Sequence, residues 1–149
     1  MGLLSVIVPS YNEEDNIALA ARTVAQILHD AEIPYEILFV DDGSRDKTYA
    51  RICEESRENP KVRGLSFSRN FGKEASIFAG LREARGDCCV ILDCDLQFPP
   101  KVIPDMYRLW EQGYEVVEGI KASRGKESLL HKCSAGAFYK LISRCTHVD

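Results

Sequence analysis

The chain has 149 residues, of which 45% are hydrophobic and 28% charged, with a net charge of −4. This balance is typical of one globular domain and argues against a disordered chain, a collagen-like fibre or a repeat array. No apolar stretch approaches the ~20 residues of a membrane helix, and no secretory leader precedes the first apolar run. We therefore expect a soluble, cytoplasmic chain.

Charge is divided unevenly along the sequence. Residues 1–118 carry 13 Lys or Arg against 21 Asp or Glu, whereas residues 119–149 carry six against two. A basic C-terminal segment on an acidic body indicates an anionic partner, such as a phosphate or a membrane surface, although a solvated helix face explains any single charge equally well.

The six cysteines do not form a recognisable site. They stand at positions 53, 88, 89, 94, 133 and 145, and none belongs to a CxxC pair. A zinc site and a disulfide framework are therefore both unexpected. We interpret these cysteines as small buried hydrophobic side chains in a reducing compartment.

Apolar runs predict five strands in chain order. They cover residues 3–9, 36–40, 62–67, 88–92 and 115–120, and continuous apolar runs of this length are typical of strands buried on both faces.

Helical patterns separate the strands. The first has Ile17, Ala21, Val24 and Leu28 on one stripe, as an amphipathic helix requires. The later helices are expected around Tyr49, Ile52 and Cys53; over residues 73–84 with Ile77 and Leu81 inward; after Pro99-Pro100 with Ile103, Met106 and Trp110; and over residues 128–144.

The alternation of strands and helices predicts an α/β fold. We expect a parallel or mostly parallel sheet with helices on both faces, in one domain spanning residues 1–149. Ligands bind such sheets at the carboxyl ends of the strands. Polar clusters follow the first four strands, at residues 9–14, 41–44, 68–73 and 93–97.

The last of these clusters has the spacing of a metal site. Strand side chains alternate, so Asp93, Asp95 and Gln97 point the same way if the extended form continues. Three oxygen donors suit Mg²⁺ or Mn²⁺, which takes further ligands from phosphates. The alternative is a turn in which the two aspartates cap the next helix.

The other clusters indicate nucleotide contacts. Of the adjacent pair Asp41-Asp42, one carboxylate is interpreted as an acceptor for a base or ribose and the other as support for a turn. Tyr11 offers a flat face to a base, or is a partly buried aromatic. Gly72 allows close approach of a ligand, and Lys73 at a helix start suits a phosphate.

Four blocks together resemble a known family. VIVPSYNEEDNI, FVDDGSRDKT, LSFSRNFGKEAS and ILDCDLQFPP closely resemble the family 2 glycosyltransferases of the GT-A fold. Among these, the chain looks most like the polyprenyl-phosphate hexosyltransferases, namely dolichol-phosphate mannose synthases and bactoprenol glucosyltransferases of the cell envelope. The resemblance implies metal-dependent, inverting transfer of a hexose from a UDP- or GDP-sugar to a polyprenyl phosphate.

The resemblance also implies roles for individual residues. Nucleotide-sugar contacts fall on Pro9, Tyr11, Asn12, Glu13, Asp42, Gly72, Lys73 and Asp93. The D-x-D metal site falls on Asp93, Asp95 and Gln97, with the side chain of Cys94 facing away. Lys121 and Arg124 match basic residues that lie near the phosphates in lipid-linked relatives, which implies an acceptor or phosphate contact.

Relatives continue beyond the point that matches Asp149. They add a Ser/Asp-Phe-Arg-Leu-like motif, interfacial helices and often transmembrane helices. We therefore expect an N-terminal part of the enzyme, with the candidate catalytic base outside this chain and the full-length form at the cytoplasmic face of a membrane.

Three alternatives stay open from the sequence. The first is a catalytically inactive nucleotide-binding module. The second is a receiver-like signalling domain, although the acidic pair of a receiver ends the first strand and here it ends the second. The third is a nucleotidyltransferase, which usually needs a first loop rich in glycine and lysine. We expect no nucleic-acid partner, and a homo-oligomer is open.

Overall fold

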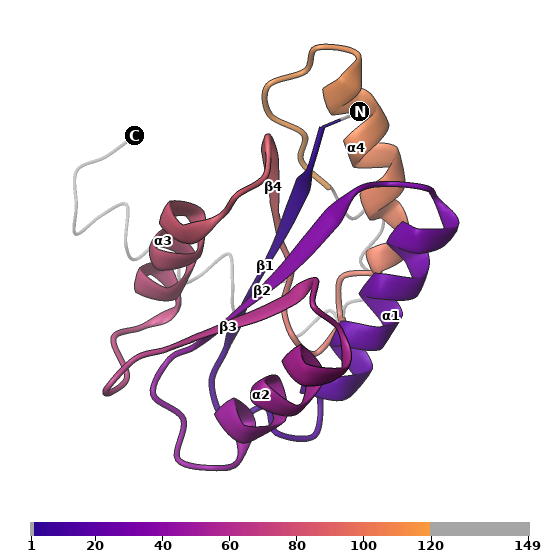
Figure 1. The fold of residues 1–149 in the computed structure, drawn as a ribbon. Helices are drawn as coiled ribbons and strands as arrows, with labels where there is room; N and C mark the ends of the chain where they lie inside the picture. The colour runs from indigo at the N-terminus through magenta and orange to yellow at the C-terminus, as the bar shows by residue number, and fades with distance from the viewer. Residues whose placement is uncertain (1, 120–149) are drawn as a thin grey trace, which may run out of the picture. The chain divides into compact units, whose positions relative to one another are not determined.

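The computed structural model of the chain describes residues 2–119, nearly all within one compact unit formed by residues 1–118 (Figure 1). In this part of the chain no helix is long and apolar enough to cross a membrane. The helix predicted over residues 128–144, and Lys121 and Arg124, lie outside the described residues. The single domain over residues 1–149 stays a prediction.

The four predicted strands up to residue 92 form one parallel sheet. They are β1 (Leu4–Ser10), β2 (Tyr35–Asp41), β3 (Val62–Ser66) and β4 (Cys88–Ile91), in the order β3-β2-β1-β4. The chain moves outward from β1 to β3 and then returns to the other side of β1. The carboxyl ends of β1 and β4 therefore border the topological switch point, where ligands bind in open α/β sheets.

Helices cover the two faces of the sheet unequally. α1 (Ile17–Asp30), α2 (Thr48–Glu58) and α4 (Ile103–Glu111) lie on one side, with the short 3-10 helix η1 (Pro100–Val102) before α4, and α3 (Lys73–Glu83) lies on the other (Figure 1). The predicted α/β architecture with helices on both faces is confirmed.

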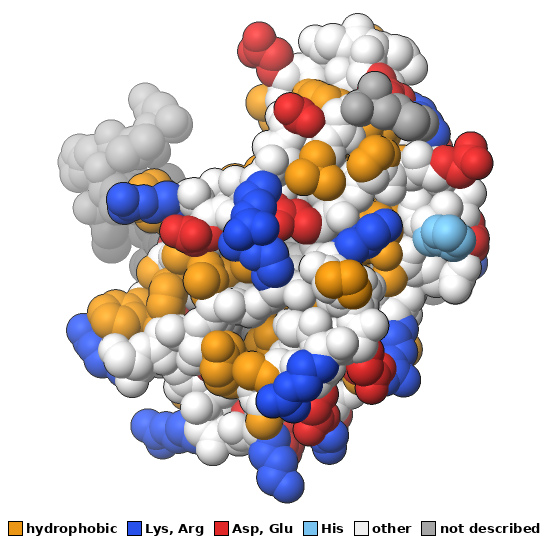
Figure 2. All heavy atoms as spheres, viewed as in Figure 1, with side chains coloured by type: hydrophobic (Ala, Val, Ile, Leu, Met, Phe, Trp, Pro, Cys, Tyr) orange, Lys and Arg blue, Asp and Glu red, His pale blue; other side chains and the backbone are white. Residues whose placement is uncertain are grey.

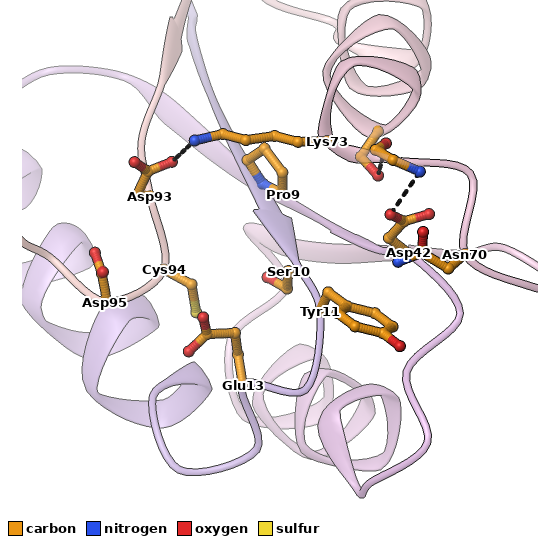
Figure 3. A pocket seen from close by; sticks show the side chains of 12 residues that line it. Pro9, Ser10, Tyr11, Glu13, Asp42, Asn70, Lys73, Asp93, Cys94 and Asp95 are labelled. Atoms are coloured by element: carbon orange, nitrogen blue, oxygen red, sulfur yellow. Dashed lines mark hydrogen bonds and ion pairs between the residues drawn. The ribbon is translucent and has the colours of Figure 1, made fainter. Parts of the chain in front are cut away.

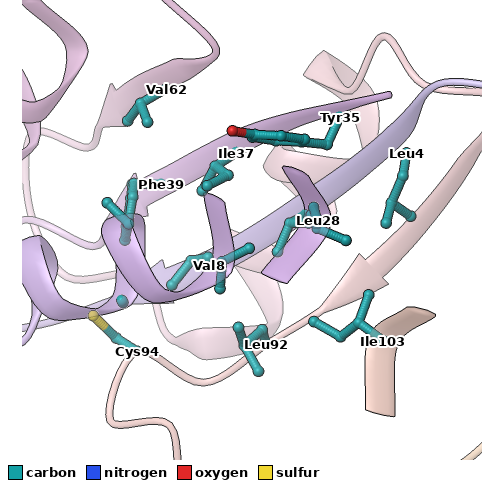
Figure 4. Packing of buried hydrophobic residues seen from close by; sticks show 14 of the residues in the cluster. Leu4, Val8, Leu28, Tyr35, Ile37, Phe39, Val62, Leu92, Cys94 and Ile103 are labelled. Atoms are coloured by element: carbon teal, nitrogen blue, oxygen red, sulfur yellow. The ribbon is translucent and has the colours of Figure 1, made fainter. Parts of the chain in front are cut away.

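The alternation of strand side chains builds two cores. Val8, Ile37 and Phe39 belong to the larger cluster under α1 (Figure 4), whereas Ile7 and Leu38, on the opposite face, pack under α3. All five are fully buried, and each such aliphatic or aromatic side chain stabilises the fold by about 1.5–3 kcal/mol. Burial on both faces explains why these strands read as continuous apolar runs.

A buried polar cluster ties the sheet to the end of α3. The Glu36 carboxylate accepts hydrogen bonds from the Ser5 hydroxyl at 2.7 Å, the Arg85 backbone N–H at 2.6 Å and Arg63 Nη1 at 2.7 Å. Burial raises the pKa of Glu36, but these hydrogen bonds and the Arg63 charge outweigh it and hold the pKa below its usual value. The ionised carboxylate is therefore the stable form in the fold.

The inward face of α3 differs from the predicted one. Ser76 and Gly80 face the sheet, whereas Ile77 is only partly buried and Leu81 is 46% exposed. A Cβ at Gly80 would overlap Ile7 Cγ2, so the helix approaches the sheet through its small residues and its larger ones lie at the flanks. Hydrophobic side chains consequently reach the surface among charged ones on the face in view (Figure 2).

The predicted fifth strand is also wrong over residues 115–119. These residues form no strand, and Val116 is 86% exposed. An apolar run becomes a strand only where a neighbouring strand can take its backbone hydrogen bonds, and within residues 2–119 this segment has no such partner.

Candidate functional site

A cavity of about 370 Å³ lies at the carboxyl ends of the strands, and all four strand-end clusters contribute to it (Figure 3). Strand pairing brings the clusters together, because Ser10 lies opposite Asp41 and Asp41 opposite Ser66. The lining residues are Pro9, Ser10, Tyr11, Glu13, Asp42, Asn70, Gly72, Lys73, Ser76, Asp93, Cys94 and Asp95.

The loop after β1 is tied to the loop after β2. The Asn12 backbone N–H donates to Ser44 Oγ at 2.9 Å, and Asn12 Oδ1 accepts the Arg45 backbone N–H at 2.9 Å. The Glu13 backbone N–H donates to Thr48 Oγ1 at 2.8 Å. Asn12 adopts a φ of 55° and is absent from the cavity wall, so its side chain holds the loops and thereby positions Tyr11 and Glu13.

The loop after β2 is tied in turn to the loop before α3. Asp42 is 4% exposed, and its two carboxylate oxygens accept the backbone N–H groups of Phe71 at 2.7 Å and Gly72 at 2.9 Å. Gly43 has a φ of +67°, and a Cβ there would lie 2.6 Å from Arg69 Cα. This close approach is possible only because residue 43 is glycine.

The two adjacent aspartates have separate tasks. Asp41 accepts the Ser44 backbone N–H at 3.1 Å and the Ser66 hydroxyl at 2.8 Å, which supports the turn. Asp42 faces the cavity, where the remaining lone pairs of its oxygens can accept a ligand's hydroxyl or N–H group.

The acidic end of the cavity departs from the expected geometry. β4 ends at Ile91, and a turn follows in which the Leu96 N–H donates to the Asp93 carbonyl at 3.1 Å, with a φ of 55° at Leu96. The extended form therefore stops before Asp93, and the predicted alternation of side chains does not apply. Asp95 Oδ1 accepts the Gln97 N–H at 3.1 Å within the turn, and Gln97 is absent from the cavity wall.

The cysteine between the two aspartates is buried where the cavity meets the core. Cys94 is 3% exposed and packs with the larger hydrophobic cluster. Burial raises the pKa of its thiol to about 12, so the thiol stays protonated and is a poor ligand for a metal ion.

The two exposed carboxylates fit a hard divalent cation that takes only part of its coordination from the protein. Asp93 and Asp95 both line the cavity, and no group of three His, Cys, Asp or Glu side chains with metal-binding geometry occurs in residues 2–119. Mg²⁺ and Mn²⁺ prefer oxygen ligands, and Mg²⁺ commonly binds through one or two carboxylates together with water and substrate phosphates. Gln97 as a third ligand stays a prediction.

Three polar residues of the cavity wall had no assigned role from the sequence: Ser10, Asn70 and Ser76. Ser10 and Asn70 belong to the strand-end clusters, which is the signal that could have singled them out. Ser76 lies one turn into α3, fully buried, with its hydroxyl 3.4 Å from the Gly72 carbonyl. Its signal is weaker, since a serine inside a helix usually carries no function.

The family model of glycosyl transferase family 2 matches residues 5–144, which is most of the chain. The chain belongs to this family. A family 2 member has the GT-A fold, and membership excludes the receiver-like alternative.

Two of the most similar relatives are more than a third identical to this chain over the aligned residues. An uncharacterized glycosyltransferase of Bacillus subtilis is 39% identical over 145 residues, which are 97% of this chain and 45% of the relative. The bactoprenol glucosyl transferase of Shigella phage SfV is 39% identical over 141 residues, which are 95% of this chain and 46% of the relative. The chain thus spans about half the length of the curated relatives it matches.

A solved structure has the same fold. The mannosyltransferase of Pyrobaculum calidifontis, in complex with GDP-Man and Mn²⁺, superposes with a TM-score of 0.60 at 24% identity, over 72% of this chain and 32% of that one. At this identity the likeness shows the fold of the chain.

Proposed function

We propose that this chain binds a UDP- or GDP-sugar together with Mg²⁺ or Mn²⁺, and that the protein transfers the hexose, with inversion, to a polyprenyl phosphate. One observation carries the donor part: a single cavity joins an aromatic and amide end, with Tyr11 and Asn70, to an acidic end with Asp93 and Asp95. A nucleoside diphosphate has the matching chemistry, with a flat base at one end and a metal-binding diphosphate at the other.

Hydrogen bonds between the loops fix the proposed nucleoside end of the cavity before a ligand binds. Tyr11 is 41% exposed and offers its ring to a base. Asp42 is fixed by two backbone N–H groups and accepts a hydrogen bond from the base or ribose. Because hydrogen bonds fix these loops, little conformational entropy is lost when the nucleoside binds.

The diphosphate end carries charges of both signs. Asp93 and Asp95 hold the cation, which when bound acts as a Lewis acid that stabilises the departing nucleoside diphosphate. Lys73 begins α3, where the positive end of the helix dipole also favours phosphate oxygens. These groups neutralise the charge that develops as the glycosidic bond breaks.

The acceptor half of the proposal rests on the relative named a bactoprenol glucosyl transferase and on the basic composition of residues 119–149. A polyprenyl phosphate is already anionic at neutral pH, so its attacking oxygen needs little deprotonation. Lys121 and Arg124, outside the described residues, are proposed to hold this phosphate. A basic segment also suits an anionic membrane surface.

The donor site is tested by calorimetry of the 149-residue chain with UDP and GDP, with and without Mn²⁺. We expect Mn²⁺ to tighten binding of one nucleotide by about tenfold or more, and Asp95→Asn to abolish that gain by removing a charged cation ligand. Asp105→Asn, an exposed carboxylate on α4, is the matched control and should behave as wild type. The assignment fails if neither nucleotide binds or if Asp95→Asn retains the gain.

Sugar transfer by the isolated 149-residue chain is tested separately, with radiolabelled UDP-glucose or GDP-mannose as donor and a short polyprenyl phosphate as acceptor. Labelled lipid in the organic phase is the expected product. Nucleotide binding without any transfer under saturating donor and Mn²⁺ would instead support an inactive nucleotide-binding module for the isolated chain.

A further inference from the structure

The side chain of Lys73 lines the cavity and forms an ion pair with Asp93. Its Nζ is 2.5 Å from Asp93 Oδ1, and Figure 3 shows the side chain reaching over Pro9 toward the acidic end. The two side chains are 54% and 51% exposed. The ion pair thus joins the helix that borders the nucleoside end to the turn that carries the proposed cation ligands.

The ion pair between Lys73 and Asp93 competes with donor binding. The cation needs the Asp93 carboxylate, and the diphosphate needs the Lys73 ammonium group. Asp93 cannot give its charge fully to an ammonium group and to a divalent cation at once, because the two cations repel each other at such short range. Lys73 likewise cannot neutralise a diphosphate while it is paired with Asp93.

We propose that Lys73 is an exchangeable counter-ion, which neutralises Asp93 in the donor-free protein and passes to the donor's diphosphate when nucleotide and cation bind. The inference rests on the proposed function, and to the phosphate contact of Lys73 it adds the neutralisation of Asp93 before the donor binds. The exchange moves one ammonium group between two anionic partners and leaves every covalent bond intact.

The fixed backbone and flexible side chain of Lys73 favour this exchange. The backbone before it is fixed, because Gly72 donates its N–H to Asp42 at 2.9 Å, while the side chain ends in a flexible four-carbon stem with a single charge. Exposed ion pairs hold their members weakly, so little is lost when Lys73 leaves Asp93. A hydrogen bond to a charged phosphate in a partly enclosed site is stronger.

If Lys73 exchanges partners in this way, removing it should change the affinity for Mn²⁺ and the affinity for nucleotide in opposite directions. In Lys73→Met, Asp93 has lost its competitor, and Mn²⁺ alone should bind about two- to fivefold more tightly than to wild type. The same variant lacks the cation for the diphosphate, so UDP or GDP should bind about tenfold more weakly at saturating Mn²⁺. Lys73→Arg keeps the charge and should stay near wild type in both measurements.

Lys61→Met is the matched control, since it removes the same charge at the opposite end of the sheet. Lys61 precedes β3 and lies 4.4 Å from the centre of the Tyr35 ring. Mn²⁺ is titrated by electron paramagnetic resonance of the free ion, and nucleotide by calorimetry. Neither affinity should change in this variant beyond the small effect of net charge.

The outcomes separate this inference from the function on which it rests. A wild-type chain that binds no nucleotide in the presence of Mn²⁺ overturns both. A wild type that binds nucleotide, with a Lys73→Met variant that leaves Mn²⁺ affinity unchanged or lowers it, overturns the counter-ion role alone. A variant that tightens both Mn²⁺ and nucleotide binding overturns the transfer of Lys73 to the diphosphate.

Discussion

Replacing Gly43 with alanine tests the close contact between the loop after β2 and the loop before α3. Alanine at a φ of +67° costs about 1–2 kcal/mol. Its Cβ would also lie 2.6 Å from Arg69 Cα and 2.7 Å from the Arg69 carbonyl oxygen, and such overpacking costs about 1–3 kcal/mol. We expect Gly43→Ala to lower the free energy of unfolding by about 3 kcal/mol in total, from the sum of both effects.

Urea unfolding followed by circular dichroism measures this loss. With a slope of about 2 kcal/mol per molar urea, the midpoint should fall by about 1.5 M. Nucleotide affinity should fall as well, because the displaced loop carries Asn70, Gly72 and Lys73. Gly113→Ala is the control, since Gly113 has a φ of +100° but no heavy atom within 4 Å of its added Cβ.

Gly113→Ala isolates the conformational cost of about 1–2 kcal/mol, so it should shift the midpoint by about 0.5–1 M and leave nucleotide binding unchanged. The reasoning about the loop contact is refuted if Gly43→Ala is no less stable than Gly113→Ala. It is refuted equally if Gly43→Ala loses stability but binds nucleotide as wild type does, since the loop would then not have moved.

Two further predictions follow from buried titratable groups. Glu36→Gln should lower the free energy of unfolding by about 3 kcal/mol at pH 7. The pKa of Glu36 in the folded chain lies below its ordinary value of 4.5. The difference in stability between wild type and variant should therefore be full above about pH 4.5 and shrink as pH falls through the lowered pKa. A difference that is the same at pH 7 and pH 3 in urea titrations would contradict it. The Cys94 thiol is buried, and burial raises its pKa to about 12, so it should escape iodoacetamide at pH 8 in the native chain. Burial also raises the pKa of Cys89, but its side chain is exposed and should react faster. Equal labelling by mass spectrometry would show that Cys94 is accessible.

The sheet and the gathering of the site were predictable from the sequence. Residues 37–40 of β2 are all apolar because both faces of the strand are buried, and parallel strands bring their carboxyl ends to one edge. Pro9, Asp42 and Asp93, far apart in sequence, therefore had to meet.

Details that depend on close packing or on unusual backbone angles were not predictable. Ile77 and Leu81 look like the buried face of α3, but Gly80 permits a closer approach that turns them aside. The turn after Asp93 depends on a positive φ at Leu96, which leucine rarely adopts and its sequence context does not signal. The role of Asn12 in joining loops is likewise visible only once its partners are placed.

The hydrogen bonds between the three loops have a consequence for how such sites can be recombined. Asn12 bonds to the loop after β2, and Asp42 of that loop bonds to the segment before α3. Residues that share a network contribute non-additively. Moving any one of these loops into another protein thus leaves hydrogen-bond donors and acceptors without partners, both in the moved loop and in the loops that remain. The loops at the Tyr11 end of this cavity therefore form one unit for transplantation, whereas an exposed ion pair between Lys73 and Asp93 ties the turn after β4 to them.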